Sequence, residues 1–441
     1  MWKISKFTKM VENSNRELLL YNSYIGENSL CKLTDLDNID IILSGDIEKV
    51  SDSIRNILER KGIIVLDSVD ENKLLDMQYY RIASPRVMRL IINPTESCNF
   101  ACKYCYEEHV LNKMTQETQN DIVTFVGKNI QNYTGIHVSW FGGEPLVNKS
   151  SLAYISNRIA KICKFNKRKY TADMTTNAYL LDYDTFNEML SYNIKKFQIT
   201  VDGTKDIHDS QRVLKNGKGT YDQILKNLNA IKNSRRRDFK VLIRVNFTEK
   251  LYDAFEEFYK SIESFISDDR FYISFFTVKD IEGTAVEELK KDILDNKRNP
   301  MKRIYDLIYE NSKSLNLAKE LLNPGMSLCY GGKRDNFVIK ADGSVYKCTI
   351  DFEDKKNQVG ILANGKMTLF DKYYNYISDR YKCAEYYECF FAPVCTGDPC
   401  PKKDSKQKNC SFLKENMEIV LCIMDKYSGF EVIDGGMCNE L

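Results

Sequence analysis

From about residue 87 the chain alternates short runs of β-branched and aromatic residues with longer stretches whose apolar positions recur every three or four residues. The runs predict strands and the stretches predict amphipathic helices. The predicted strands are VMRLIIN, IHVSW, KYTADMTT, KKFQITV, FKVLIRVNF and FYISFF, and the helices include QETQNDIVTFVGKNIQ, SLAYISNRIAKIC and YDQILKNLNAIKN. This alternation predicts a parallel sheet with right-handed crossovers, curled into a partial (β/α)6 TIM-like barrel within residues 83–300. Functional side chains are then expected at the carboxyl ends of the strands.

Residues 1–82 have the pattern of a separate small module. ELLLYNSYIG and SLCKL predict strands, Gly26-Glu27-Asn28 predicts a turn between them, and helical spacing runs through VSDSIRNILERKG before GIIVL. Two interpretations remain open for this module. It is either a winged-helix-like domain that captures a peptide as an added strand, or a packing extension of the next domain.

Composition narrows the function. The 441 residues include 64 Lys and Arg against 62 Asp and Glu. The net charge of +2 therefore gives no strong positive electrostatic potential that would attract the phosphates of nucleic acid. The sequence contains no apolar run long enough to span a membrane, and its start lacks a signal peptide, which predicts a cytoplasmic protein. In such a compartment, fourteen cysteines and only three histidines favour thiolate ligation of metals over disulfides.

Three of the cysteines, Cys98, Cys102 and Cys105, follow the first predicted strand in NPTESCNFACKYCY. Three thiolates this close together can hold one iron-sulfur cube, but a cube has four irons. One iron would therefore stay open to a small-molecule ligand. The alternative, a zinc or electron-transfer site, needs a fourth ligand, for which His109 is the local candidate.

This C-x3-C-x2-C motif, followed after the second predicted strand by WFGGEPL, resembles the radical SAM superfamily. The resemblance implies that a [4Fe-4S] cluster on the three catalytic cysteines cleaves S-adenosylmethionine (SAM) to a 5′-deoxyadenosyl radical. It also implies a set of SAM contacts at the strand ends. The matching residues are Tyr104 near adenine, Gly142, Gly143 and Glu144 around the SAM ammonium, Thr176, Asn177, Thr200 and Asp202 for ribose and methionine, and Arg212 for the carboxylate, with Asn246 as a further candidate.

Beyond residue 300 the pattern breaks into short pieces that contain many cysteines, and their order resembles the SPASM extension of radical SAM peptide maturases. The resemblance implies two auxiliary [4Fe-4S] clusters within residues 301–441. Their ligands would be Cys329, Cys348 and Cys400 for the inner cluster, and Cys383, Cys389, Cys395 and Cys410 for the outer one. Tyr386 occupies the place of the usual third cysteine, which leaves Cys383 in doubt as a ligand. Two clusters offer eight ligand positions, but only seven cysteines align with the extension. The inner cluster therefore either keeps an open iron or uses Cys422 or Cys438.

The resulting hypothesis is a radical SAM oxidoreductase that forms a thioether in a ribosomally synthesised precursor peptide bearing cysteine, with the N-terminal module holding the leader and flavodoxin or ferredoxin supplying electrons. A formylglycine-generating sulfatase-type maturase and a carbon-carbon crosslinking maturase are the alternatives within the superfamily. Outside it, the alternative is an iron-sulfur electron carrier or peptide-binding scaffold, which would not cleave SAM.

Overall fold

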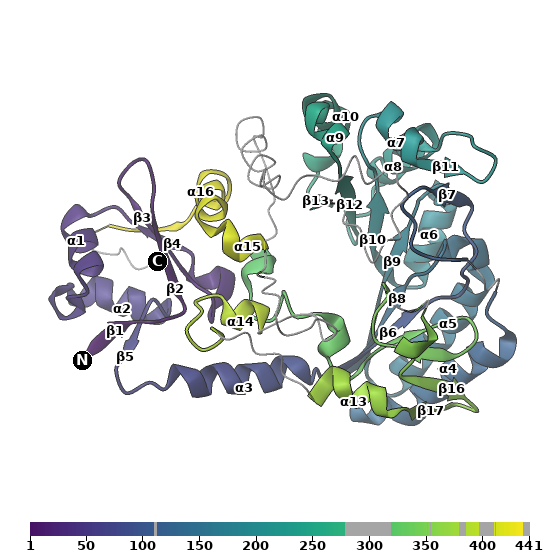
Figure 1. The fold of residues 1–441 in the computed structure, drawn as a ribbon, viewed down its shortest axis with the longest axis horizontal. Coiled ribbons are helices and arrows are strands. Elements are labelled where there is room, and N and C mark those ends of the chain that lie inside the picture. The colour runs from purple at the N-terminus through teal and green to yellow at the C-terminus, as the bar shows by residue number, and fades with distance from the viewer. Residues whose placement is uncertain are drawn as a thin grey trace. The chain divides into compact units, whose positions relative to one another are not determined.

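The computed structural model describes residues 1–109, 113–277, 319–350, 352, 354–378, 385–396, 410 and 412–434. Contacts divide the chain into two compact units (Figure 1). Unit 1 comprises Met1–Ser84, Met301–Arg334 and Tyr376–Leu441, and unit 2 comprises Pro85–Pro300 and Asp335–Asn375. The predicted C-terminal segment 301–441 is therefore shared between both units. Because these units follow spatial contacts, the domain boundaries expected from the sequence remain a prediction.

Unit 2 is built on a parallel sheet whose strands are neighbours in chain order. The strands are β6 (Val87–Ile92), β8 (Gly135–Trp140), β9 (Lys169–Thr176), β10 (Ile194–Thr200), β12 (Lys240–Phe247) and β13 (Phe271–Thr277). Each lies within one or two residues of a strand predicted from the sequence, so the predicted parallel α/β core is confirmed. Beyond β6 the sheet continues with β14 (Asn336–Ile339), parallel to β6, and then antiparallel β15 (Ser344–Tyr346), β16 (Gly360–Ala363) and β17 (Lys366–Leu369).

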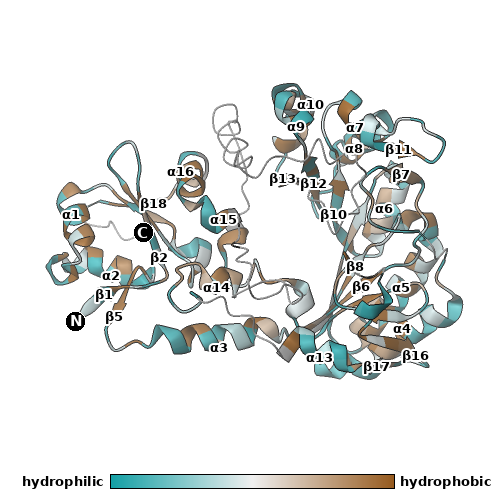
Figure 2. Ribbon diagram, viewed as in Figure 1, coloured by the Kyte–Doolittle hydropathy of each residue, from teal (hydrophilic) through white to brown (hydrophobic). Residues whose placement is uncertain are grey.

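The crossovers between the parallel strands are helical, and Figure 2 shows hydrophilic and hydrophobic residues along them. The helices are α4 (Gln116–Asn129), α5 (Lys149–Phe165), α6 (Tyr183–Ser191), α7 (Lys205–Gln211), α8 (Tyr221–Lys232), α9 (Glu249–Asp253) and α10 (Phe255–Ile266), with α13 (Asp371–Ser378) at the boundary with unit 1. Short elements complete the unit: η3 (Ile130–Asn132), η4 (Pro145–Asn148), η8 (Lys355–Asn357), and the hairpin pair β7 (Phe100–Cys102) and β11 (Arg212–Leu214).

Successive side chains along each strand point to opposite faces of this sheet. Phe197 of β10 packs on Phe186 of α6 with ring centroids 5.3 Å apart, and Phe275 of β13 packs on Phe255 of α10 at 5.7 Å. Residues of this parity therefore face the helices and bury apolar area, the main favourable term in folding. Residues of the other parity point away from these helices and are largely polar.

Unit 1 contains a four-stranded sheet of order β18-β4-β3-β2 and a two-stranded sheet. The strands are β2 (Thr8–Glu12), β3 (Leu18–Asn22), β4 (Cys31–Leu33) and β18 (Glu431–Ile433), and β1 (Trp2–Ile4) pairs with β5 (Ile64–Leu66). The helices are α1 (Leu36–Ser44), α2 (Asp52–Arg60), α3 (Glu71–Ala83), α14 (Ala392–Cys395), α15 (Phe412–Glu415) and α16 (Met417–Ser428), with η1 (Gly26–Ser29), η2 (Ile47–Lys49), η6 (Lys319–Leu322) and η7 (Tyr330–Gly332). Strand β18 joins the N-terminal sheet from the far end of the chain, which the sequence pattern did not indicate.

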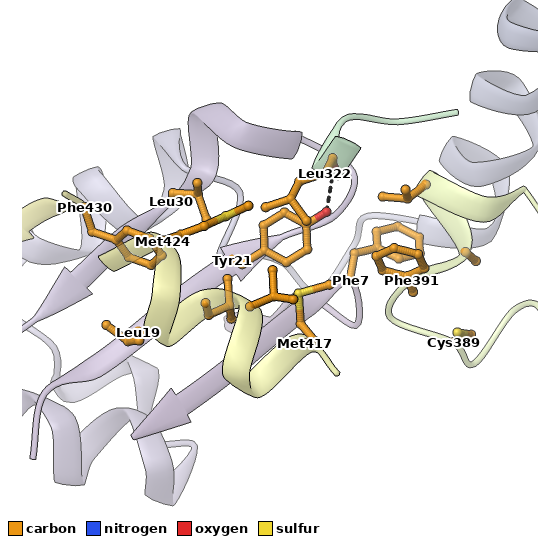
Figure 3. Close-up of a cluster of buried hydrophobic side chains, with 14 of the residues drawn as sticks. Phe7, Leu19, Tyr21, Leu30, Leu322, Cys389, Phe391, Met417, Met424 and Phe430 are labelled. Carbon is orange, nitrogen blue, oxygen red and sulfur yellow. Dashed lines mark hydrogen bonds between the residues drawn. The ribbon is translucent and has the colours of Figure 1, made fainter. Parts of the chain in front are cut away.

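Strand β3 is buried on both faces, because alternate side chains enter different cores. Leu18 and Leu20 pack with residues of α1 and α2, whereas Leu19 and Tyr21 pack with residues of α16. Figure 3 shows the second core, in which the Tyr21 hydroxyl donates a 2.6 Å hydrogen bond to the carbonyl of Leu322. The first 84 residues thus share a core with C-terminal helices. No helix within the described ranges is long and apolar enough to cross a membrane.

Candidate active site

Strand β8 ends in a turn that lets two chain segments approach closely. Gly142 has φ +92°, and a Cβ added there would lie 1.9 Å from Oδ1 of Asn93. A Cβ on Gly143 would lie 2.5 Å from the backbone oxygens of Glu96 and Ser97. Glycine is therefore required at both positions, where the turn packs against the loop that leads to the cysteines.

The carboxylate of Glu144 lies at the centre of this strand edge and is fully buried. It accepts hydrogen bonds from Thr176 Oγ1 at 2.8 Å, the backbone N–H of Asn177 at 2.7 Å and that of Leu146 at 3.0 Å. Burial raises the pKa of Glu144, although these donors oppose the shift. The carboxylate is thereby fixed between the ends of β8 and β9.

Of the three predicted cluster cysteines, Cys98 lies in the loop between β6 and β7, Cys102 is the last residue of β7, and Cys105 follows that strand. Cys102 is in register with Arg212 of β11, and the N–H of Cys105 donates to the carbonyl of Cys102 at 3.1 Å. Burial is the main cause that raises the pKa of Cys98 to about 12 and that of Cys105 to about 11, so ligation must displace their protons. Among the described residues no three His, Cys, Asp or Glu side chains gather around a single metal ion. A cube binds each thiolate through a different iron, so its ligands need not converge on one point.

Tyr104 is the hub of a buried polar network. Its hydroxyl donates a short hydrogen bond to Asp202 Oδ2 and accepts from Arg212 Nη1 at 2.5 Å and from Asn246 Nδ2 at 3.1 Å. Burial holds the pKa of Tyr104 well above its usual value, so the phenol is neutral. Burial alone would lower the pKa of Arg212, but Tyr104, Cys102 and Asp202 outweigh it and raise the pKa. Arg212 lies in β11 and Asn246 in β12, whereas Tyr104 follows β7 and Asp202 follows β10.

A second chain of hydrogen bonds supports Arg212 and Asp202. Burial and the charge of Arg212 keep the pKa of His208 well below its usual value, so the imidazole is neutral. Its Nδ1 accepts from the N–H of Asp202 at 3.1 Å, which leaves the proton on Nε2 to be donated to Thr220 Oγ1 at 3.2 Å. Thr220 in turn donates to the carbonyl of Arg212 at 2.6 Å.

The sequence reasoning missed several residues of this edge. Asn99 accepts from Asn177 Nδ2 at 2.8 Å, and so ties the cysteine loop to the end of β9. Glu107 accepts from the N–H of Gly143 at 2.8 Å. His109, which the sequence analysis did name as a possible fourth ligand, contacts Cys105 Sγ at 3.5 Å. The signal for Asn99 was its place inside the cysteine motif, whereas nothing in the spacing pointed to His208.

The residues present fit the cofactors that the cysteine motif implies. Three thiols suit an iron-sulfur cube with one open iron. Nearby, some buried polar atoms could also bind a ligand. Nε of Arg212 and both polar side-chain atoms of Asn93 are buried without a hydrogen-bond partner among the described residues. Buried polar atoms are costly when unpaired, so a polar ligand that satisfies them is favoured here.

The C-terminal cysteines fall in both units. Cys348 follows β15 in unit 2, whereas Cys329, Cys389, Cys395, Cys410 and Cys422 belong to unit 1. Cys389 is buried in the core shown in Figure 3, and Tyr386, which replaces an expected cysteine, is a buried member of the same core. The predicted ligands Cys383, Cys400 and Cys438 lie outside the described residues.

The parallel sheet carries glycines, a buried glutamate and three cysteines at its carboxyl edge, which is the arrangement that the motif resemblance implies for a SAM-dependent iron-sulfur enzyme. Residues 92–262 match the Radical SAM superfamily model, and the chain is a radical SAM enzyme. The cofactors of this superfamily are SAM and a [4Fe-4S] cluster.

Several proteins with similar sequences are named as sulfatase-maturating enzymes. A cysteine-type anaerobic sulfatase-maturating enzyme of Clostridium perfringens (strain 13 / Type A) is 24% identical over 352 residues, which cover 73% of this chain and 90% of that relative. The enzyme of the same name from Clostridium novyi (strain NT) is 26% identical over 290 residues, 59% of this chain and 73% of the relative. The solved structure of native anSMEcpe with bound AdoMet shares the fold, with a TM-score of 0.59 and 20% identity, and covers 77% of this chain and 96% of that chain.

Proposed function

We propose that this enzyme matures a ribosomally synthesised, cysteine-bearing precursor peptide by joining the cysteine sulfur to an unactivated carbon as a thioether. The observation that carries the proposal is the N-terminal sheet with its helices, which lies outside the 92–262 match. The solved sulfatase-maturase structure is matched along 96% of its length but accounts for only 77% of this chain. The additional part of the chain supports a further binding function, such as holding a leader sequence.

Strand β2 is the place where such a leader would bind. It lies at one end of the order β18-β4-β3-β2, so its other neighbour position is open to an added strand within the described part of unit 1. An extended peptide added at a sheet edge gains main-chain hydrogen bonds without a preformed pocket. In this proposal the winged-helix-like module of residues 1–82 concentrates the core peptide near the radical SAM domain.

The C-terminal cysteines would hold two auxiliary [4Fe-4S] clusters, as a SPASM domain does. Lys414 supports the assignment of Cys389 and Cys410 to the same outer cluster, because its Nζ lies 3.5 Å from Cys410 Sγ and also interacts with Cys389. The inner cluster would use Cys329, Cys348 and Cys400, with an open iron or with Cys422 or Cys438 as the eighth ligand.

In the radical SAM domain, bound SAM and the cluster on Cys98, Cys102 and Cys105 supply the 5′-deoxyadenosyl radical. The chain's own residues would bind and orient SAM: Glu144 would accept a hydrogen bond from the SAM ammonium, and Arg212 would bind the SAM carboxylate through a bidentate fork. Thr176, Asn177, Thr200 and Asp202 would contact ribose and methionine. A reductase such as flavodoxin or ferredoxin in the cytoplasm would supply electrons.

Mass spectrometry of the peptide tests the proposal. The enzyme should be co-expressed with a short cysteine-bearing reading frame beside its gene, with Cys98→Ala as the inactive control. A thioether lowers the peptide mass by two hydrogens and removes one alkylatable thiol. Loss of the sulfur atom, or a crosslink with every thiol still alkylatable, would contradict the proposal.

Leader binding has its own test with an internal control. Hydrogen exchange of the full enzyme, with and without that precursor, should show slower exchange of backbone amides in β2. Strand β18 at the other edge of the same sheet should stay unchanged. Equal protection of both strands, or of neither, would argue against binding at β2.

A sulfatase-type maturase that converts cysteine or serine to formylglycine is the second candidate, and the names of the clostridial relatives favour it. It predicts a neighbouring sulfatase gene and loss of sulfur from a cysteine substrate. Carbon-carbon crosslinking shares the loss of two hydrogens with the thioether but leaves the thiols free.

A further inference from the structure

The parallel sheet of unit 2 has an unusual second face. Parallel strands are commonly buried on both sides and read as continuous apolar runs. Here the residues that point away from the helices are polar or charged along most of the sheet. This polar face comprises Arg89, His137, Ser139, Thr171, Asp173, Thr175, Lys196, Gln198, Lys240, Arg244, Asn246, Tyr272 and Ser274.

The strand register places charged groups side by side on this face. Ser139, Asp173 and Lys196 form one row across β8, β9 and β10. Lys196 is exposed although β10 is a central strand, and the side chains of Asp173 and Arg89 keep 27% and 36% of their accessible surface. The polar face is therefore accessible and charged in the described residues.

The charge of the polar face is strongly unbalanced. Asp173 is the only acidic residue in the sequences of the six parallel strands. Its Oδ2 lies 2.7 Å from His137 Nε2 and 3.5 Å from Arg89 Nη2, so this carboxylate is already shared. Lys196 and Arg244 add positive charge for which the strands contain no second carboxylate. The further carboxylate that interacts with Arg244 is that of Asp202, which follows β10 and is already hydrogen-bonded to Tyr104 and to the N–H of Asn246.

Arg244 connects this charge to the carboxyl edge of the sheet, where the proposed SAM contacts lie (the SAM edge). It is in register with Thr200 at the carboxyl end of β10, and its Nε donates to Oδ1 of Asn246 at 3.2 Å. Asn246 in turn donates to the hydroxyl of Tyr104. Lys196 lies four residues before Thr200, or about 13 Å along the strand at 3.3 Å per residue. The cations thus extend from the SAM edge into the polar face.

We propose that the polar face binds carboxylates of the substrate peptide, with Arg244 and Lys196 as the residues that select an acidic core segment. The inference rests on the proposed peptide maturase function and adds a substrate class to it. A guanidinium binds carboxylate oxygens in a planar, two-pronged contact, and charge-assisted hydrogen bonds are among the stronger ones. The proposed carboxylates are those of Asp and Glu side chains in the core segment, and the test distinguishes them from the carboxylate at the peptide's C-terminus.

Peptide selection on the reconstituted holoenzyme tests this inference and does not require the natural precursor. The probe is a library of randomised decapeptides with one fixed cysteine, prepared with either amidated or free C-termini. Wild-type enzyme should enrich Asp and Glu over Asn and Gln by about tenfold in the amidated library, the size expected for one charge-assisted contact. Enrichment only of peptides with free C-termini would assign the terminal carboxylate instead.

Lys196→Gln and Arg244→Gln should each lower the enrichment toward the input ratio. Lys195→Gln is the matched control, because Lys195 is the preceding residue of β10 but pairs with Asp238 instead of facing Asp173. Its variant carries the same charge change and should select as wild type does. No acidic enrichment by the wild type, or an equal loss in Lys195→Gln, would overturn the inference. Deoxyadenosine formed from SAM is measured separately, so a failure of radical SAM chemistry is distinguishable from a failure of carboxylate selection.

Discussion

Gly143→Ala should disrupt the contact between the glycine turn after β8 and the loop that leads to Cys98. The added Cβ would lie 2.5 Å from the backbone oxygens of Glu96 and Ser97, whereas ordinary contacts begin at 3.4 Å. The loop before Cys98 must therefore retreat by about 1 Å, because backbone cannot rotate aside as a flexible side chain can. Overpacking of this kind costs about 1–3 kcal/mol of the free energy of unfolding. The N–H of Glu144 also donates to the carbonyl of Ser97 at 3.0 Å, so the shift also strains the position of Glu144.

Gly127→Ala is the control. Gly127 lies within α4, and its added Cβ would meet only Cδ1 of Ile162, at 3.8 Å. Alanine in a helix interior should stabilise the protein by about 0.5–1 kcal/mol. Denaturant unfolding under anaerobic conditions gives both stabilities, and iron content with deoxyadenosine yield reports the site. A Gly143→Ala variant with wild-type stability, iron and SAM cleavage would refute the steric argument.

The remaining predictions concern the clusters and the pH dependence of stability. Cys98→Ala should abolish deoxyadenosine formation, whereas Cys348→Ala should spare much of it and impair peptide product; full SAM cleavage by the Cys98 variant would contradict the ligand assignment. The side chain of Arg270 hydrogen-bonds to Asp268 and lowers the pKa of that carboxyl to about 2 from an ordinary value of 3.8. A lowered folded-state pKa means that this pair stabilises the fold above about pH 4 and loses its contribution as pH falls toward 2. Unfolding free energies between pH 2 and 5 should therefore fall less steeply for Asp268→Asn than for wild type, and equal slopes would count against the pairing.

Local pattern located the elements of unit 2 well, because each parallel strand has a strongly apolar helix-facing side. KYTADMTT, for example, is β9 from its first residue to its last. The same local signal failed at β18, since a three-residue strand has too few positions to show a period and gains its stability only by pairing with β4. It also gave no hint that Tyr386 lies in the core that contains Tyr21.

The sequence by itself determined the chemistry at the strand ends: the three cysteines, the glycine pair and Glu144 are each specified by residue type and spacing. Only the tertiary structure decided how side chains from different strands meet. The bonds from Tyr104 to Asp202, Arg212 and Asn246, and the row that joins Asp173 to Lys196, depend on strand register. Register is set by packing among segments far apart in the chain, and a one-residue slip of a strand would turn its side chains, such as Asn246 of β12 or Asp173 of β9, to the other face.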